Sequence, residues 1–177
     1  ISRLMGAEVI ETELNGNCAI DLRALRGAVT PRTKLIWLCN PNNPTGTLFD
    51  LEDFRSLKAS LPERAWIILD EAYAEFADPA LLPDSPREVL AGPVIAVRTF
   101  SKAYGLAGAR LGYALARPEV IRVIDTVAEP FNANRVGIAG ATAVLRDELD
   151  YAREITRKIT ESRRRTEEAL RDRGYEV

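Results

Sequence analysis

The sequence predicts an α/β protein built on a mostly parallel sheet. Short apolar segments alternate with amphipathic helical segments from the first residues onward, a pattern typical of βαβ units. The apolar segments 34–39 and 65–69 are continuous rather than alternating, as expected of strands covered on both faces. Polar residues follow directly after these segments, where open α/β sheets bind their ligands.

Individual elements can be assigned in chain order. Asp21 and Asp50 stand where a helix needs an N-cap. Pro118 takes the first helical position that proline favours, and Pro130 ends that helix. Residues 79–86, bounded by prolines, predict a surface loop. We expect strands at residues 8–14, 34–39, 65–69, 94–97 and 111–116, and helices at 21–29, 50–59 and 118–130.

A long helical segment follows from Arg135 to about Arg173. Apolar positions recur at helical spacing while Arg and Glu occupy the other faces, so we expect one long helix or two consecutive helices. The basic run 163–165 could bind phosphate, but a solvated helix face is the better interpretation. We therefore assign that run no function.

Composition and charge limit the partners. The chain of 177 residues is long enough for one domain or for part of a larger protein, and we expect a fragment because it begins at Ile1 and stops at Val177 just after a helical segment. The net charge of -2, spread over interspersed acids and bases, favours neither nucleic acid nor an anionic membrane. No apolar run approaches the ~20 residues of a membrane helix. A soluble protein with a small-molecule partner is expected.

Two residue types narrow the chemistry further. Cys18 and Cys39 lie in strand-like apolar segments without metal-ligand spacing, which favours buried thiols of a reducing compartment, the cytoplasm, over a disulfide. The chain has no histidine, so Ser-His and zinc-His mechanisms are excluded within it.

Three polar loops follow predicted strands, at residues 40–46, 70–73 and 98–102. Each alone has an ordinary explanation, as turn chemistry, a helix cap or a solvated lysine. Because the carboxyl ends of parallel strands meet at one sheet edge, we expect the loops to converge there, together with Arg110. Their amine, carboxylate, phenol, amide, hydroxyl and guanidinium groups, in a chain without histidine, form the set that handles a pyridine aldehyde phosphate.

The chemistry of such a ring suits each side chain to a role. The amine of Lys102 can form a Schiff base with the aldehyde and later act as a base. The carboxylate of Asp70, directly after a buried strand, can favour the protonated ring nitrogen, which makes the ring withdraw electrons. The phenol of Tyr73 and the amide of Asn43 can both donate hydrogen bonds to the ring oxygen.

The phosphate group requires a bidentate cation and short donors. Arg110, with Thr99 and Ser101, supplies both. Gly105 and Gly108, in the intervening loop, would let the backbone turn closely around the ligand.

These motifs resemble the signature of fold-type I aminotransferases, which use pyridoxal 5'-phosphate. The segments 40–46, 98–108 and 129–132 most resemble histidinol-phosphate aminotransferases. The resemblance implies that Lys102 carries the cofactor covalently. The matching residues, which share order and spacing over about 70 positions, are Asn43-Pro44-Thr45-Gly46, Asp70-Glu71-Ala72-Tyr73, Ser101-Lys102 and Arg110. The resemblance implies that five of these hold the cofactor: Asn43, Asp70, Tyr73, Ser101 and Arg110.

The resemblance also implies the architecture and the partners. It implies a three-layer sandwich with a mostly parallel sheet, the large domain of the pyridoxal-phosphate-dependent transferase fold. Residues 1–173 would form part of that domain, and residues 174–177 would begin a smaller C-terminal domain. A homodimer, a small-molecule amino donor and a 2-oxo acid are implied in the same way.

Two parts of the resembling proteins have no counterpart here. An N-terminal segment supplies a stacking aromatic, backbone phosphate donors and a tyrosine that reaches the partner subunit. The C-terminal domain supplies an arginine for the substrate carboxylate. We therefore expect the chain to be inactive alone.

Several functions fit the same motifs. The first is transamination between histidinol phosphate and 2-oxoglutarate in histidine biosynthesis. An aromatic amino-acid aminotransferase or a phosphothreonine decarboxylase would share the cofactor site. A non-catalytic binding module would keep only the sheet, but it would have no physical reason to retain Lys102, Asp70 and Arg110 together.

Overall fold

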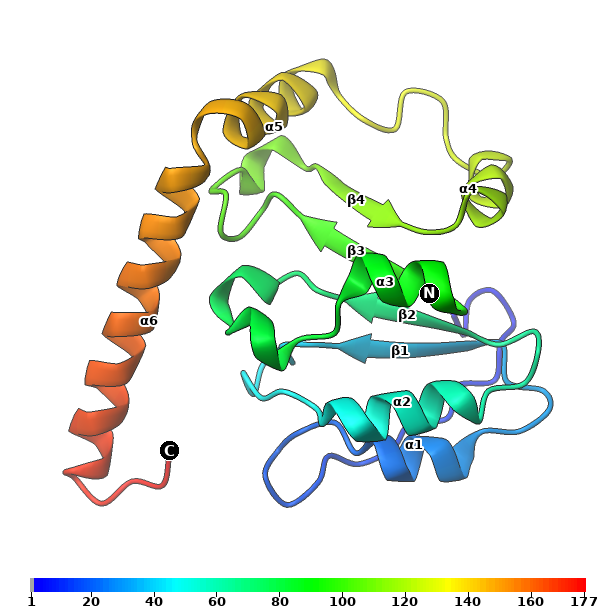
Figure 1. The fold of residues 1–177 in the computed structure, drawn as a ribbon, viewed down its shortest axis with the longest axis horizontal. Helices are drawn as coiled ribbons and strands as arrows, with labels where there is room; N and C mark the ends of the chain where they lie inside the picture. Colours follow the sequence, from blue (N-terminus) through cyan, green and yellow to red (C-terminus); the bar gives the residue numbers. More distant parts are fainter. Residues whose placement is uncertain (1) are drawn as a thin grey trace.

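The computed structural model describes residues 2–177 and centres on a four-stranded sheet (Figure 1). Its strands are β1 (Leu35–Cys39), β2 (Trp66–Asp70), β3 (Val94–Thr99) and β4 (Gly112–Leu115), in that spatial order. The first three strands are parallel, and β4 is antiparallel to β3. The mostly parallel α/β sheet is therefore confirmed, with an antiparallel strand at one edge.

The helices connect and flank these strands. Asp21 and Asp50 cap the first two helices as expected, since each carboxylate accepts two backbone N–H groups of the first turn. The helices are α1 (Leu22–Ala28), α2 (Leu51–Ala59), α3 (Ser85–Ala91), α4 (Pro118–Asp125), α5 (Arg135–Asp147) and α6 (Leu149–Arg171), with short 3-10 turns η1 (Ala74–Phe76), η2 (Pro79–Leu81) and η3 (Ala107–Ala109).

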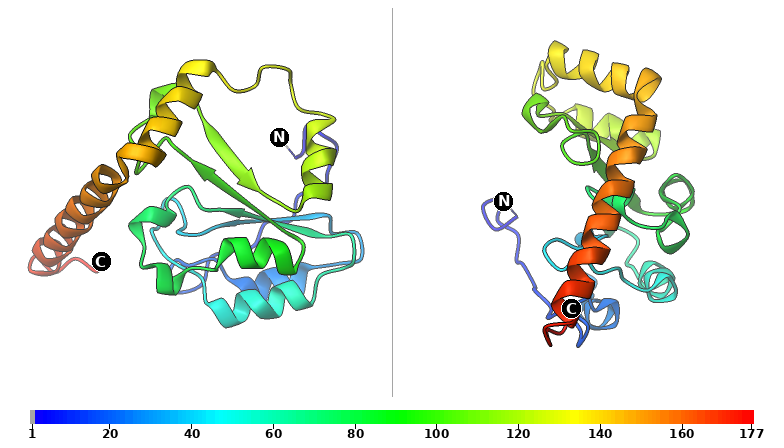
Figure 2. Two further views of the ribbon diagram at one scale, coloured as in Figure 1. Left: turned by 45° about the horizontal axis from the view of Figure 1, so that its top comes forward. Right: turned by 90° about the vertical axis from the view of Figure 1, so that its left-hand side faces the viewer.

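One face of the sheet packs against α1, α2 and α3 (Figures 1 and 2). Alternate strand residues point to this face, because successive side chains of a strand lie on opposite sides. Burial of their apolar surface against the helices is the main stabilising contribution of the fold. The core residues are Leu22, Ile36, Leu38, Phe49, Phe54, Leu57, Ile67, Leu69, Val89, Val94 and Ala96.

The opposite face of the sheet, which we call the open face, lacks such cover at β1. Leu35 and Trp37 alternate with the core residues of this strand and are 50% and 61% exposed. The continuous apolar character of β1 predicts cover on both faces. At this strand, residues 2–177 supply only one of the two helical layers of the expected sandwich.

Several expectations outside the sheet were wrong. Residues 8–14 do not form a strand, and only Leu14 makes an isolated antiparallel bridge, with Ile20. Alternation yields a strand only where a neighbour completes its hydrogen bonds, and no strand among residues 2–177 pairs with this segment. The helix that opens at Pro118 ends at Asp125 rather than Pro130. Neither cysteine is buried as expected, since Cys18 is exposed and Cys39 is half-buried, although both are free thiols.

The expected loop at residues 79–86 contains η2 and the beginning of α3. The Asp84 carboxylate caps α3 by accepting a hydrogen bond from the Arg87 amide. At seven residues, α3 is too short to show a helical repeat in the sequence, which is why it was missed.

The C-terminal third forms two consecutive helices, one of the two expected arrangements, and α6 extends along one side of the molecule (Figure 2). The side chains of the basic run are largely solvated, as interpreted, because they are 59% to 70% exposed and pair within the helix. The pairs are Arg163 with Glu167, Arg164 with Glu168 and Arg165 with Glu161. No helix of residues 2–177 combines the length and apolar character that crossing a membrane requires.

Candidate active site

The carboxyl ends of β1, β2 and β3 lie side by side, so the loops after them begin at one sheet edge. In register, Cys39 pairs with Asp70, and Asp70 pairs with Val97. The ladder continues one residue further, since the Asn40 amide donates to the Asp70 carbonyl and the Glu71 amide donates to the Val97 carbonyl, both at 2.9 Å. The three loops therefore start together, as the strand order predicts.

Asp70 points to the open face of the sheet. It shares that face with Trp37, because Cys39 pairs with Asp70 two residues after Trp37. Its half-buried carboxylate accepts a hydrogen bond from the Ala72 amide at 3.0 Å. This bond orients the carboxylate and leaves lone pairs free for a cationic partner.

Lys102, Tyr73 and Asn43 come together from three loops. The Asn43 amide nitrogen lies 3.4 Å from the Tyr73 hydroxyl. Lys102 Nζ lies over the Tyr73 ring, 5.0 Å from its centroid, where an ammonium is attracted to the aromatic face. An amine that can react with a carbonyl thus lies beside two donors suited to a ring oxygen.

The loop that carries Asn43 is held in shape by its own atoms. Asn42 donates through its side chain to the Thr45 hydroxyl at 2.7 Å, and the Gly46 amide donates to the Asn42 carbonyl at 2.7 Å. Gly46 has a φ of 70°, which glycine adopts without strain. The turn leaves the Asn43 side chain exposed and available.

The residues expected to bind phosphate are only partly brought together. The Thr99 hydroxyl accepts a hydrogen bond from the Ser101 amide at 3.1 Å and lies 3.4 Å from the Leu111 carbonyl, so it braces the loop. Arg110 adopts a φ of 51° and donates through Nη1 to the Ala107 carbonyl at 2.8 Å. Ser101 and Arg110 therefore stand at opposite ends of one loop, with the guanidinium turned back onto it.

A buried carboxylate that the sequence analysis did not single out lies on the helix-covered side. Glu71 is 1% exposed, and it accepts hydrogen bonds from Arg98 Nε at 2.9 Å and from the Ser85 hydroxyl. Burial opposes the charge on Arg98, but its hydrogen bond and charge interaction with Glu71 outweigh that effect and raise its pKa. Glu71 could have been found from the sequence, because successive side chains of a strand alternate between the two faces of the sheet. The residue after Asp70 must therefore point toward the helices.

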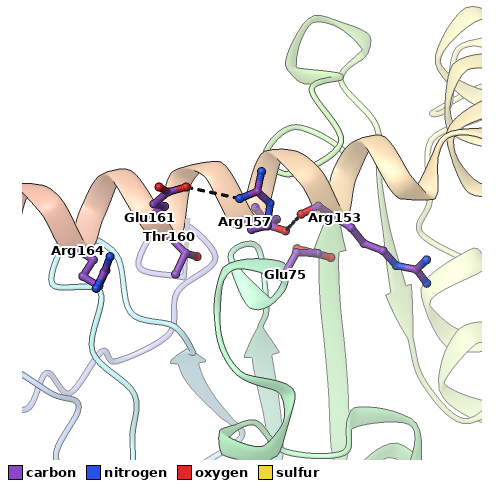
Figure 3. Close-up of a pocket in the computed structure, with 7 residues that line it drawn as sticks. Glu75, Arg153, Arg157, Thr160, Glu161 and Arg164 are labelled. Carbon is purple, nitrogen blue, oxygen red and sulfur yellow. Dashed lines mark hydrogen bonds and ion pairs between the residues drawn. The ribbon is translucent and has the colours of Figure 1, made fainter.

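A groove lies along the contact between η1 and α6. Burial raises the pKa of Glu75, and burial together with the charge of Glu75 raises the pKa of Tyr104 to about 12. Because η1 directly follows Tyr73, α6 supports the loop that carries the phenol. The groove has a volume of about 500 Å³ and is lined by Glu75, Arg153, Thr156, Arg157, Thr160, Glu161 and Arg164 (Figure 3).

A second cavity of about 500 Å³ opens beside Asn43 and Tyr73. Phe76 contributes to its wall, and Arg163 reaches it from α6. The two loop residues chosen from the sequence therefore border a hollow of the size that holds a small molecule.

The functional groups of these side chains are of the types that pyridoxal phosphate requires. Lys102 offers an amine for the aldehyde, and Asp70 offers a carboxylate for the ring nitrogen. Asn43 and Tyr73 offer two donors for the ring oxygen, and their separation of 3.4 Å allows both to reach one atom. The Ser101 hydroxyl begins a phosphate site that Arg110 completes only if its side chain leaves the Ala107 carbonyl.

Comparison with known proteins shows the family of the chain. Residues 1–177 match the family described as aminotransferase class I and II. The chain is 42% identical over 99% of its length to an aromatic amino acid aminotransferase of Mycolicibacterium vanbaalenii, of which it covers 50%. It is 43% identical over 83% of its length to a histidinol-phosphate aminotransferase of Moorella thermoacetica, of which it covers 38%.

A solved structure agrees. The histidinol-phosphate aminotransferase of Sinorhizobium meliloti, in complex with pyridoxal 5'-phosphate, superposes with a TM-score of 0.87 and 38% identity over 96% of this chain and 46% of that one. The chain thus spans about half the length of these relatives. By family match and fold, the chain belongs to the class I and II aminotransferases.

Proposed function

We propose that the chain is the cofactor-binding part of an aminotransferase that exchanges an amino group between histidinol phosphate and 2-oxoglutarate in histidine biosynthesis. One observation carries the proposal: Lys102 Nζ lies over the ring of Tyr73, whose hydroxyl is 3.4 Å from Asn43. Two observations support histidinol phosphate as the amino donor. They are the amino-acid sequences of segments 40–46 and 98–108 and the similarity of the chain to histidinol-phosphate aminotransferases.

An aromatic amino-acid aminotransferase is the second candidate. The relative of that name matches nearly the whole chain at an identity close to that of the histidinol-phosphate enzymes. A phosphothreonine decarboxylase would use the same cofactor site, but it would break the bond from Cα to the carboxylate, release carbon dioxide and need no 2-oxo acid.

The proposed chemistry follows from four side chains. When bound, pyridoxal phosphate supplies the aldehyde that accepts the amino group and the ring that withdraws electrons. Lys102 would hold the cofactor covalently at rest, and its Nζ, freed when the amino donor displaces it, would take the proton from Cα of that donor. Asp70 would stabilise positive charge at the ring nitrogen. Tyr73 and Asn43 would donate hydrogen bonds to the ring oxygen and so orient the bound cofactor.

The binding and assembly roles complete the proposal. Ser101 and Arg110 would contact the phosphate, with Thr99 holding the Ser101 amide. Residues 1–173 would belong to the large domain and residues 174–177 to the start of a smaller one, a boundary supported by the end of α6 at Arg171. The complete protein would act as a homodimer in the cytoplasm, on a small amino donor and a 2-oxo acid, with the free thiols suiting a reducing compartment.

Borohydride reduction of the full-length protein with bound cofactor tests the site. Peptide mapping should find the cofactor on Lys102, and not on Lys34, Lys58 or Lys158, the other lysines of this chain. Lys102→Ala should abolish the adduct, whereas Lys158→Ala, on the exposed side of α6, should retain it. An adduct on any other lysine would refute the assignment.

Turnover measurements test the substrate. Histidinol phosphate, phenylalanine and tyrosine are compared as amino donors of the full-length protein, with 2-oxoglutarate as acceptor, and phosphothreonine is tested for release of carbon dioxide. We expect the highest kcat/KM for histidinol phosphate. A preference for phenylalanine or tyrosine would establish the second candidate instead.

A further inference from the structure

We infer that Glu71 and Arg98 form a positioning pair, a buried ion pair that fixes the distance between Asp70 at the end of β2 and Lys102 beyond the end of β3. The inference rests on the proposed roles of Asp70 and Lys102. It adds a function for two residues that the proposed chemistry does not use.

The contacts of the Glu71 side chain hold it in one conformation. Its side chain has no exposed area, and that of Arg98 is 27% exposed. One carboxylate oxygen accepts from Arg98 Nε at 2.9 Å and the other from the Ser85 hydroxyl, so both oxygens are engaged. A buried charge is tolerated only with such partners, and a planar guanidinium fixes direction as well as distance.

The pair reinforces a backbone link at the same place. Glu71 follows Asp70 in the chain, and its amide donates to the Val97 carbonyl at 2.9 Å. Arg98 follows Val97, so the side-chain pair joins β2 and β3 beside the end of their main-chain ladder. It therefore reinforces the ladder at the point from which the two loops begin.

The backbone from Arg98 to Lys102 is held in place by hydrogen bonds and burial. Phe100 lies between them, is 4% exposed and donates through its amide to the Leu111 carbonyl at 3.1 Å. The Ser101 amide is held by the Thr99 hydroxyl at 3.1 Å. A shift of Arg98 is therefore transmitted to Lys102 rather than absorbed by the loop.

The pair acts from the side of the sheet opposite the candidate site. Ser85 is the first residue of α3, which packs on the helix-covered face, whereas Asp70 points to the open face. Glu71 therefore does not touch a ligand held by Asp70. Its effect on the site is one of geometry, passed through the adjoining backbone.

The structure offers a matched control for loss of stability. Lys58 and Glu88 form an ion pair between α2 and α3 with side chains 20% and 16% exposed. This pair joins two helices and no strand end. Its removal should destabilise the protein to a similar extent without moving Asp70 relative to Lys102.

The test uses the full-length holoenzyme and the variants Glu71→Gln, Arg98→Met, Arg98→Lys and the control Glu88→Gln. Urea midpoints rank their stability. Cofactor dissociation, circular dichroism of the cofactor absorption band, kcat and KM then report the site. We expect Glu71→Gln and Arg98→Met to weaken cofactor retention and lower kcat by about tenfold or more, because small misplacements of reacting groups carry penalties of that order. Arg98→Lys should recover part of the loss.

The outcomes distinguish a positioning role of the pair from a role in stability alone. The inference is supported if Glu88→Gln, at comparable stability, leaves the dichroism and kcat near those of the unmodified protein. It is overturned if the Glu71 and Arg98 variants alter the site no more than this control does. Should Glu71→Gln fail to fold, Arg98→Lys, which keeps the charge, is compared with Glu88→Gln instead. A greater change at the site in Arg98→Lys supports the inference, and no greater change overturns it. Labelling of a lysine other than Lys102 in the unmodified protein would instead refute the proposed site and this role with it.

Discussion

Asp70 and Glu71 are adjacent carboxylates that point to opposite faces of the sheet. The pleat of β2 sends the first toward the open face and the second toward Arg98 and Ser85. The position of Asp70 at the sheet edge could be anticipated because it ends an apolar run. For Glu71, alternation could show which face it points to but not its partners, which come from segments 14 and 27 residues away. The contact of Arg110, whose guanidinium binds its own loop, could not be anticipated either.

At the residue scale, Asp70→Ala should slow proton removal from Cα of the amino donor far more than it weakens cofactor binding. The contacts of Ser101 and Arg110 would remain, while the group that stabilises charge at the ring nitrogen would be lost. Such a loss is typically worth ~3 kcal/mol, about a hundredfold in rate. Stopped-flow measurement of the half-reaction in the full-length protein checks it, with Asp125→Ala at the exposed end of α4 as control. A near-normal half-reaction would contradict the role of Asp70.

Secondary-structure elements were predictable where a local signal and a neighbour agreed. α1 and α2 begin at aspartates that cap them, and β1 and β2 are apolar runs that pair with each other. Residues 8–14 carry the local pattern of a strand but have no partner in the sheet. α3 has the cap but too few residues for a repeat. Pairing and packing are properties of distant segments, so local pattern alone did not decide these two cases.

At the element scale, Gly112→Ala should destabilise the β3–β4 pair. A Cβ at Gly112 would lie 2.7 Å from the Arg98 carbonyl oxygen, a backbone atom that cannot move without distorting the ladder. Forcing extra atoms into such a contact typically costs about 1–3 kcal/mol. Gly108→Ala is the control, because a Cβ there meets no atom within 4 Å. Urea denaturation of the full-length variants checks this, and equal midpoints for the two would show that the strands can separate slightly without loss.

The whole molecule is asymmetric, with one sheet face covered by helices and the other open at Leu35 and Trp37. The candidate site is open as well, since Asn43, Lys102 and Arg110 are all exposed. Motifs could identify the family, and the chain spans about half the length of the relatives it matches.

At the scale of the molecule, the polypeptide of residues 1–177 should bind pyridoxal phosphate weakly and show turnover near zero with histidinol phosphate. An exposed ligand site loses much of the benefit of orientation, and exposed apolar surface promotes association. Turnover assays and light scattering on this polypeptide, beside the full-length protein, check both expectations. Ordinary turnover by a monodisperse sample of residues 1–177 would overturn them.

The open face also has an optical consequence. The chain has only two tryptophans, and they differ in environment: Trp37 is 61% exposed, whereas Trp66 is half-buried with Arg117 over its ring at 5.3 Å. Fluorescence of an indole in water is shifted to the red, and it moves to the blue when apolar groups replace that water. Trp37 is therefore an intrinsic fluorescent reporter of whether this face of the sheet is bare or covered, and it needs no added label.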